Sequence, residues 1–322
     1  MPIGLARAVG WWMKEGDPIA LFCAIARGVI MKCIGFKRSP QLHVLRARSK
    51  TRYVESEILG NKMYLDLQDP GISSDLLRDG IREPFLTESI QKEIRKGDVI
   101  VDIGANIGYY ALQEARLAGD NGRVYAIEPV PENVELLKKN IELNNYSNIE
   151  VFQLAVGAAS KTDYIYISNY RNTAAMIKTQ SYIDKVPVQV TTLDKFLENK
   201  PPPNLIRMDV EGYEVEIVKG MTKLLESNKP LKLIVELHPP YYVTKEKRKD
   251  FLKTLKESRF QVKWAIYEPY PASLLSEPAF IRKAVNVISQ RANFGFGYVN
   301  VTIDDLLSRE RISFLEVLFE RK

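Results

Sequence analysis

The stretch that decides the fold reads VIVDIGANIG and spans residues 99–108. Its first half is almost wholly apolar, as expected of a strand that is buried on both faces of a sheet. Gly104 and Gly108 then permit a sharp turn and let a ligand approach the backbone closely. Asp102 stands where a carboxylate can steady this turn, or can accept a hydrogen bond from a cationic amino group through water. A strand, a glycine-rich turn and a helix in this order predict a ligand-binding edge of a parallel sheet.

Strands and helices alternate along the residues that follow. We expect strands at 99–103, 123–127, 149–156, 205–208, 231–237 and 260–266, and helices at 108–118, 131–144, 213–225 and 244–257. This alternation predicts an α/β fold with a doubly wound, mostly parallel sheet. Residues 313–319 are reached without a long helix, so we expect this last strand to insert antiparallel. Insertions are expected at about 160–190, as a hairpin or lid, and at about 267–300.

The chain divides into three predicted parts: a basic helical arm at 1–60, a hairpin and lead-in helix at 61–97, and a ligand-binding domain at 98–322. The hairpin turns at Gly60-Asn61. Residues 1–60 contain ten Lys or Arg and four acids, which accounts for the whole net charge of +6. Subtracting these from 46 basic and 40 acidic residues leaves 36 of each sign in the body. A neutral body argues against wrapping nucleic acid.

An apolar run at 19–36 within the arm is close to the roughly 20 residues that cross a bilayer. Arg27 near its middle argues against a spanning helix. We favour a helix that packs on the body or forms an oligomer contact. The alternative is peripheral membrane contact through residues 1–50, with Trp11 and Trp12 at the headgroups. Two cysteines with no disulfide pattern are typical of a cytoplasmic protein, and membrane association is the alternative localisation.

A second acid, Glu128, follows the second strand, where a carboxylate can accept both ribose hydroxyls of an adenosine. A dinucleotide fingerprint needs a second glycine in the turn to admit the pyrophosphate, and Asn106 occupies that place. A side chain there crowds a pyrophosphate, whereas S-adenosylmethionine (SAM) has no phosphate. We therefore predict SAM as the cofactor, with Ala155 and Val156 beside the adenine.

A third group of polar residues lies at the ends of the next two strands. The stretch IRMDVEGYE at 206–214 places Asp209 at the crevice, and Glu236 and His238 follow the neighbouring strand. Because adjacent parallel strands end at one edge, we expect these three side chains to meet there. His238 suits a general base that takes a proton from an acceptor hydroxyl. A divalent metal held by the three is the alternative, which we do not favour because the spacing matches no recognised ligand motif.

With these residues assembled, the chain resembles the FkbM family of SAM-dependent methyltransferases over about 80–266. The likeness rests on VDIGANIG at 101–108, Glu128-Pro129 with Pro131, Thr192-Leu193-Asp194, DVEGYE at 209–214, and Glu236 with His238. It implies a class I methyltransferase fold and O-methylation of hydroxyls on sugars, glycans, glycolipids or secondary metabolites. Arg207 stands where the family usually has lysine, a change that keeps the charge.

Three other functions remain open on the sequence alone. The first is an RNA or protein methyltransferase on the same fold, the second a non-catalytic subunit that binds a partner through the N-terminal helices, and the third a dehydrogenase. For a glycan acceptor, aromatic faces suit sugar rings. We expect the acceptor wall to include Tyr166, Tyr170, Trp264 and Tyr298.

Overall fold

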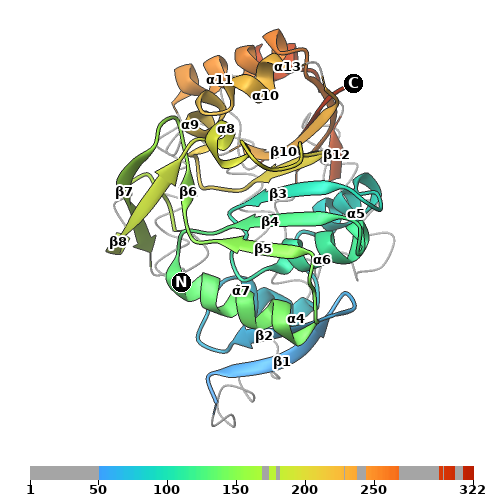
Figure 1. Ribbon diagram of the computed structural model, residues 1–322, viewed down its shortest axis with the longest axis vertical. Coiled ribbons are helices and arrows are strands. Elements are labelled where there is room, and N and C mark those ends of the chain that lie inside the picture. The colour runs from blue at the N-terminus through green and yellow to red at the C-terminus, as the bar shows by residue number, and fades with distance from the viewer. Residues whose placement is uncertain are drawn as a thin grey trace, which may run out of the picture.

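A computed structural model describes residues 51–168, 174–178, 182–227, 229–237, 244–267, 297–299, 301–308 and 315–322. Its centre is an eight-stranded sheet in the order β12-β11-β13-β10-β9-β3-β4-β5 (Figure 1). From one edge to the other, the strands are β12 (Gly297–Val299), β11 (Gln261–Tyr267), β13 (Leu315–Arg321), β10 (Leu231–Leu237), β9 (Leu205–Met208), β3 (Val99–Ile103), β4 (Arg123–Ile127) and β5 (Ile149–Phe152).

The middle of this sheet is parallel and its direction of winding reverses at β3. From β3, the chain runs to β4 and β5 on one side, then crosses to β9 and β10 on the other. Such a reversal leaves a crevice beyond the carboxyl ends of β3 and β9. The last strand, β13, pairs antiparallel with both β10 and β11, as the sequence predicts. The predicted α/β, doubly wound, mostly parallel fold is therefore confirmed.

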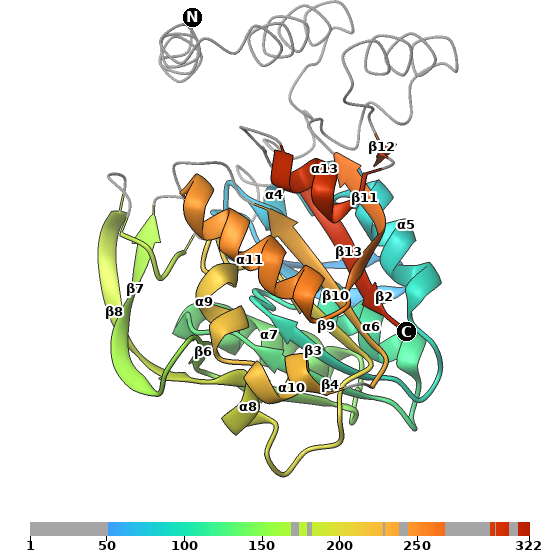
Figure 2. The same ribbon diagram turned by 90° about the horizontal axis from the view of Figure 1, so that it is seen from above.

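Helices cover both faces of the sheet, which explains why its central strands are apolar on both sides (Figure 2). One face packs against α9 (Glu214–Lys219), α11 (Lys245–Glu257) and α13 (Ile303–Ser308). The other face packs against α5 (Pro84–Glu93), α6 (Tyr109–Ala118) and α7 (Pro131–Leu143). Outside this second layer lie α4 (Ile72–Asp79) and a hairpin of β1 (Tyr53–Ile58) and β2 (Asn61–Asp66), paired in register from Tyr53–Asp66 to Ile58–Asn61. The predicted division at residue 60 falls between these two paired strands.

A small second sheet stands at the edge of the crevice (Figures 1 and 2). It consists of β6 (Ala155–Val156), β8 (Tyr182–Thr191) and β7 (Lys161–Ser168), in that order. The antiparallel pairing of β7 with β8 confirms the predicted hairpin. The single strand predicted over 149–156 is wrong: the chain leaves the main sheet after Phe152, and β6 joins the small sheet by pairing with β8.

The helix predicted over 213–225 is also two helices, α9 and α10 (Thr222–Glu226). The break falls at Gly220, whose backbone packs so closely on the carbonyl of Gly157 that a side chain would collide with it. Sequence periodicity gave no sign of this contact, because Gly157 belongs to a distant loop. A short helix α8 (Leu193–Phe196) precedes β9 and was likewise not predicted.

The N-terminal arm over 1–50 and most of 267–300 lie outside the described residues, so the arm's helices, membrane contact and oligomer contact stay predictions. No helix in the described parts of the chain is long and apolar enough to cross a bilayer.

Gly104 joins the turns after β3 and β9, and replacing it with alanine tests this junction. Its φ is +87°, and a Cβ atom would collide with the backbone carbonyl of Asp209. Gly97 has the same φ but open space around it, so Gly97→Ala is a matched control. We expect Gly97→Ala to lower the free energy of unfolding by about 1–2 kcal/mol through strain alone. Gly104→Ala should cost roughly 1–3 kcal/mol more, because the backbone must also move. Urea denaturation measures both, and equal losses would contradict the close approach of the two turns.

Candidate functional site

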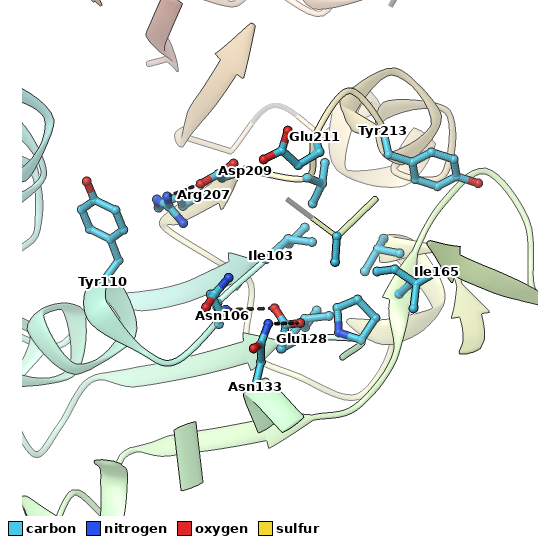
Figure 3. A pocket seen from close by; sticks show the side chains of 18 of the residues that line it. Ile103, Asn106, Tyr110, Glu128, Asn133, Ile165, Arg207, Asp209, Glu211 and Tyr213 are labelled. Carbon is cyan, nitrogen blue, oxygen red and sulfur yellow. Dashed lines mark hydrogen bonds and ion pairs between the residues drawn. The ribbon is translucent and has the colours of Figure 1, made fainter. Parts of the chain in front are cut away.

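A cavity of about 300 Å³ opens at the carboxyl ends of the central strands (Figure 3). Seven of the residues predicted to form the site line it: Gly104, Asn106, Glu128, Ala155, Val156, Asp209 and Glu236. Figure 3 shows Glu128 and Asn106 on one wall and Asp209 with Glu211 on the other. The cavity therefore lies at the switch point of the sheet, where doubly wound folds bind their ligands.

The backbone N–H groups of the turn at 104–108 all donate hydrogen bonds within the protein. Two go to the carbonyl of Ile127, one to the Glu128 carboxylate, one to the side chain of Asn106 and one to the carbonyl of Ala105. A pyrophosphate at such a turn is held by free backbone N–H groups. This turn has none to offer without breaking its own bonds, which argues against a dinucleotide more strongly than the identity of Asn106 alone.

The Glu128 carboxylate is buried but faces the cavity. Its Oε2 accepts from the backbone N–H of Asn106 at 2.9 Å, and its Oε1 accepts from the N–H of Val130 at 2.9 Å and from Nδ2 of Asn133 at 3.2 Å. An ionised carboxylate has about four acceptor sites, so roughly one remains on Oε2. Glu128 can thus accept one ribose hydroxyl directly. Accepting both, as the sequence suggested, requires the Asn133 side chain to release its bond.

Burial raises the pKa of Glu128 to about 7, although the hydrogen bonds from Val130, Asn106 and Asn133 lower it. A carboxyl with this pKa changes its ionisation near neutral pH. Because protonation turns one oxygen into an O–H donor and reduces the capacity to accept hydrogen bonds, ligand contact at Glu128 should depend on pH.

Asp102 and Gly108 do not line the cavity, so their contact with the ligand stays a prediction. Asp102 is fully buried and its Oδ1 lies 3.1 Å from Nη1 of Arg207 on the neighbouring strand. This ion pair therefore joins the carboxyl ends of β3 and β9. Gly108 has a φ of +95° at the start of α6 and packs against Leu137, so its role is in the packing of the turn on α7.

Arg207 connects the layers beneath the cavity floor. Its Nη2 lies 3.0 Å from Oδ2 of Asp209, while Nη1 holds Asp102, and its guanidinium lies 4.0 Å from the ring centre of Tyr110. Two carboxylates and one aromatic face thus fix the guanidinium plane, a geometry that lysine does not reproduce. The consequence is that Asp209 is held on the cavity wall by an ion pair with a buried cation.

Glu114 on α6 lies in the same buried cluster and is fully inaccessible to solvent. Neither of its carboxylate oxygens has a hydrogen-bond partner within the described structure, and the same holds for Oδ2 of Asp102 and Nε of Arg207. Burial, reinforced by the charge of Asp102, raises the pKa of Glu114 well above 4.5, although Arg207 opposes the shift. A neutral Glu114 leaves the charge of Arg207 balanced by Asp102 and Asp209.

Asp209 and Glu236 come together on the cavity wall because β9 and β10 are adjacent and parallel, with Met208 beside Val235. His238 lies outside the described residues, so its role as a base stays a prediction. Within the described part of the chain, no group of three or more His, Cys, Asp or Glu side chains is placed to hold a metal ion.

Two of the aromatic residues predicted for the acceptor wall, Tyr166 and Trp264, do not line the cavity, and their contact with an acceptor stays a prediction. Trp264 does not line the cavity, and its indole N–H points to Glu93 at 3.4 Å. Tyr166 packs edge-on against Tyr182, with ring centres 5.3 Å apart, and also lies outside the lining. Tyr170 and the side chain of Tyr298 fall outside the described residues. The inserted segment instead contributes apolar groups to the cavity: Ile165, Ala174 and Met176.

Sequence reasoning missed the residues that line the cavity from α4, the segment before α5, and the start of α6: Ile72, Arg82, Tyr109 and Tyr110. The two tyrosines directly follow the glycine-rich turn, which was the one available signal. Arg82 carries no local signal, since it lies upstream of every motif and reaches the cavity only through the packing of α5 on α6.

Comparison with known families now adds to this geometry. The model of the methyltransferase FkbM domain matches residues 102–262, which is half of the chain. The chain belongs to the FkbM methyltransferase family. SAM is accordingly its cofactor, as predicted.

Two curated relatives of this FkbM methyltransferase are similar over shorter stretches. The hexuronic acid methyltransferase AglP of Haloferax volcanii is 29% identical over 164 residues, which are 50% of this chain and 65% of that protein. A protein-L-isoaspartate O-methyltransferase of Methanococcoides burtonii is 46% identical over 59 residues, which are 18% of this chain and 29% of that protein. The chain thus spans less than two thirds of either relative. The crystal structure of M. jannaschii TYW2 in complex with AdoMet aligns with 85% of this chain and 89% of that chain at 15% identity and a TM-score of 0.41, a likeness too distant to support an inference.

Replacing Glu114 with glutamine tests the buried cluster. Because the pKa of Glu114 is raised in the folded state, its contribution to stability is greatest below 4.5 and is lost as pH rises toward the raised value. Glutamine does not titrate. Within that window, the free energy of unfolding of Glu114→Gln should therefore rise relative to that of the wild type by about 1.4 kcal/mol per pH unit. Urea denaturation of both proteins at pH 5, 6 and 7 measures the difference. A difference that stays constant with pH would show that Glu114 is ionised when folded.

Proposed function

We propose that this protein transfers the methyl group of SAM to a hydroxyl of a sugar, with a uronic-acid glycan as the acceptor class. The observation that carries the proposal is the cavity at the switch point, where Glu128 and the closed turn suit a nucleoside without phosphates. Membership of the FkbM family supports methyl transfer, and the similarity to a hexuronic acid methyltransferase supports the acceptor class.

The charges of the cavity suit the donor. Four acids line it, Glu128, Asp209, Glu211 and Glu236, against two arginines. SAM carries a sulfonium and an ammonium, and an acidic wall attracts both. Ala155 and Val156 offer an apolar surface beside Glu128, as expected of an adenine subsite next to a ribose subsite.

SAM supplies an activated methyl group when bound, so the protein's main task is to hold the acceptor oxygen in line with it. Asp209 is fixed by Arg207 and can orient an acceptor hydroxyl. Its Oδ2 is already occupied by the ion pair with Arg207. Glu236 and His238 are the better candidates for accepting the proton.

The acceptor is tested by incubating the protein with SAM labelled in the methyl group and with glucuronides of defined structure. We expect label in the sugar as an alkali-stable methyl ether. An alkali-labile methyl ester would place transfer on the carboxyl instead. Label in RNA or protein but not in sugar would contradict the proposed acceptor. Glu128→Gln should abolish transfer, while Glu150→Gln, on the exposed Arg123–Glu150 pair, should leave it unchanged.

The raised pKa of Glu128 predicts a pH-dependent affinity for S-adenosylhomocysteine, the demethylated product. Below about pH 7 the carboxyl is protonated and loses acceptor capacity, so affinity should fall by up to about tenfold per pH unit and level off above pH 7. Isothermal titration calorimetry between pH 5.5 and 8 measures this. Glu128→Gln should bind weakly and with no such slope; a wild-type affinity that is flat over this range would remove Glu128 from the ligand contact.

A further inference from the structure

Two cations line the cavity, Arg82 and Arg207, and only one is available to a ligand. Arg207 has both terminal nitrogens on carboxylates and its face on Tyr110, and its side chain is 4% exposed. Arg82 is different: its side chain is 23% exposed, and within the described structure its Nη2 makes no hydrogen bond. Arg82 can therefore donate to a ligand without breaking a bond of its own.

The backbone of Arg82 is fixed against the ligand-binding turn. Its N–H donates to the hydroxyl of Tyr109 at 3.1 Å, and its carbonyl accepts from the same hydroxyl at 3.0 Å. Tyr109 is the first residue of α6, directly after the turn at 104–108. The position of Arg82, in the segment between α4 and α5, is thereby tied to the turn.

The side chain of Arg82 is oriented as well. Nε lies 2.8 Å from Oε1 of Glu83, and Nη1 lies 3.2 Å from Oδ2 of Asp75. Glu83 has a positive φ of +45°, and its other oxygen accepts from the hydroxyl of Tyr110 at 2.7 Å. Strained backbone of this kind persists only where its surroundings hold it, and it concentrates at functional sites. The two carboxylates thus hold Nε and Nη1 of the guanidinium and leave Nη2 for a further acceptor.

A carboxylate is a suitable partner for Nη2, because a hydrogen bond between a guanidinium and a carboxylate is charge-assisted and stronger than a neutral one. Burial lowers the pKa of Arg82, but Glu83, Asp209 and Asp75 together hold it above its ordinary value, so the cation is permanent. SAM carries one carboxylate, at its amino-acid end.

We propose that Arg82 binds the carboxylate at the amino-acid end of the SAM cofactor. This assignment rests on the proposed function, since it assumes that the cavity holds SAM. A uronic-acid acceptor also carries a carboxylate, so the test must separate the two sources.

The test compares two ligands that differ only in this end. S-adenosylhomocysteine has the amino-acid group, and 5′-methylthioadenosine has a methyl group in its place. Calorimetry with wild type and Arg82→Met should show affinity for S-adenosylhomocysteine falling by roughly 10- to 100-fold, while that for 5′-methylthioadenosine stays within about twofold. Arg78→Met is the matched control, because Arg78 also pairs with Asp75 but does not line the cavity; it should leave both affinities unchanged.

The possible failures are distinct. If Arg82→Met weakens both ligands equally, or neither, the assignment to the amino-acid end is overturned. If it weakens only the binding of glucuronate to protein saturated with S-adenosylhomocysteine, the carboxylate belongs to the acceptor and the assignment is again overturned. If the wild type binds neither adenosine ligand, the proposed function is contradicted, and the assignment of Arg82 is overturned because it assumes that function.

Discussion

Every backbone N–H group of the turn at 104–108 donates a hydrogen bond within the protein, and the rest of the site depends on this closed turn. In a turn that binds phosphates, those N–H groups point outward to the ligand. Here one of them is bonded to Glu128, so the acid that faces the ligand also closes the turn. The same carboxylate therefore links the two strands β3 and β4 and presents an acceptor to a ribose. A cavity built in this way suits an adenosine with a positively charged tail and no phosphate.

Beneath the turn, a buried guanidinium sets the geometry of the opposite wall. Arg207 joins Asp102 on β3, Asp209 after β9 and Tyr110 on α6, and Tyr110 in turn bonds Glu83 beside Arg82. The segment upstream of β3 that contains Arg82 and Glu83 is thereby part of the site. Replacing Arg207 alone would leave buried carboxylates without their cation, a change that typically costs about 3–5 kcal/mol.

Much of the architecture could be read from local sequence. The strands at 99–103, 123–127, 205–208 and 231–237 were predicted with the observed bounds, because each is a short run that is apolar on both faces and ends in a turn. Glu128 was found for the same reason, since its place follows from the strand before it. The exit of the chain from the main sheet after Phe152 depends on contacts with residues far along the chain, which local patterns do not record.

The buried and upstream parts of the site were harder to predict for related reasons. Glu114 lies on an ordinary helical face in the sequence, and only the packing of α6 over β3 removes it from water. Arg82 reaches the cavity through the hydroxyl of Tyr109, a bond between segments that share no motif. The sequence left open whether Asp102 steadies the turn or contacts the ligand, because the choice depends on Arg207 of the neighbouring strand, to which its side chain points.

The most direct test of the closed turn is a calorimetric titration of the full-length protein with S-adenosylhomocysteine and, separately, with NADH. The account predicts micromolar binding of S-adenosylhomocysteine, about −8 kcal/mol, and no measurable binding of NADH, because no backbone donor remains for its pyrophosphate. Tight binding of NADH would mean that the turn opens to accept phosphates, and it would contradict the reading of the cavity as a SAM site.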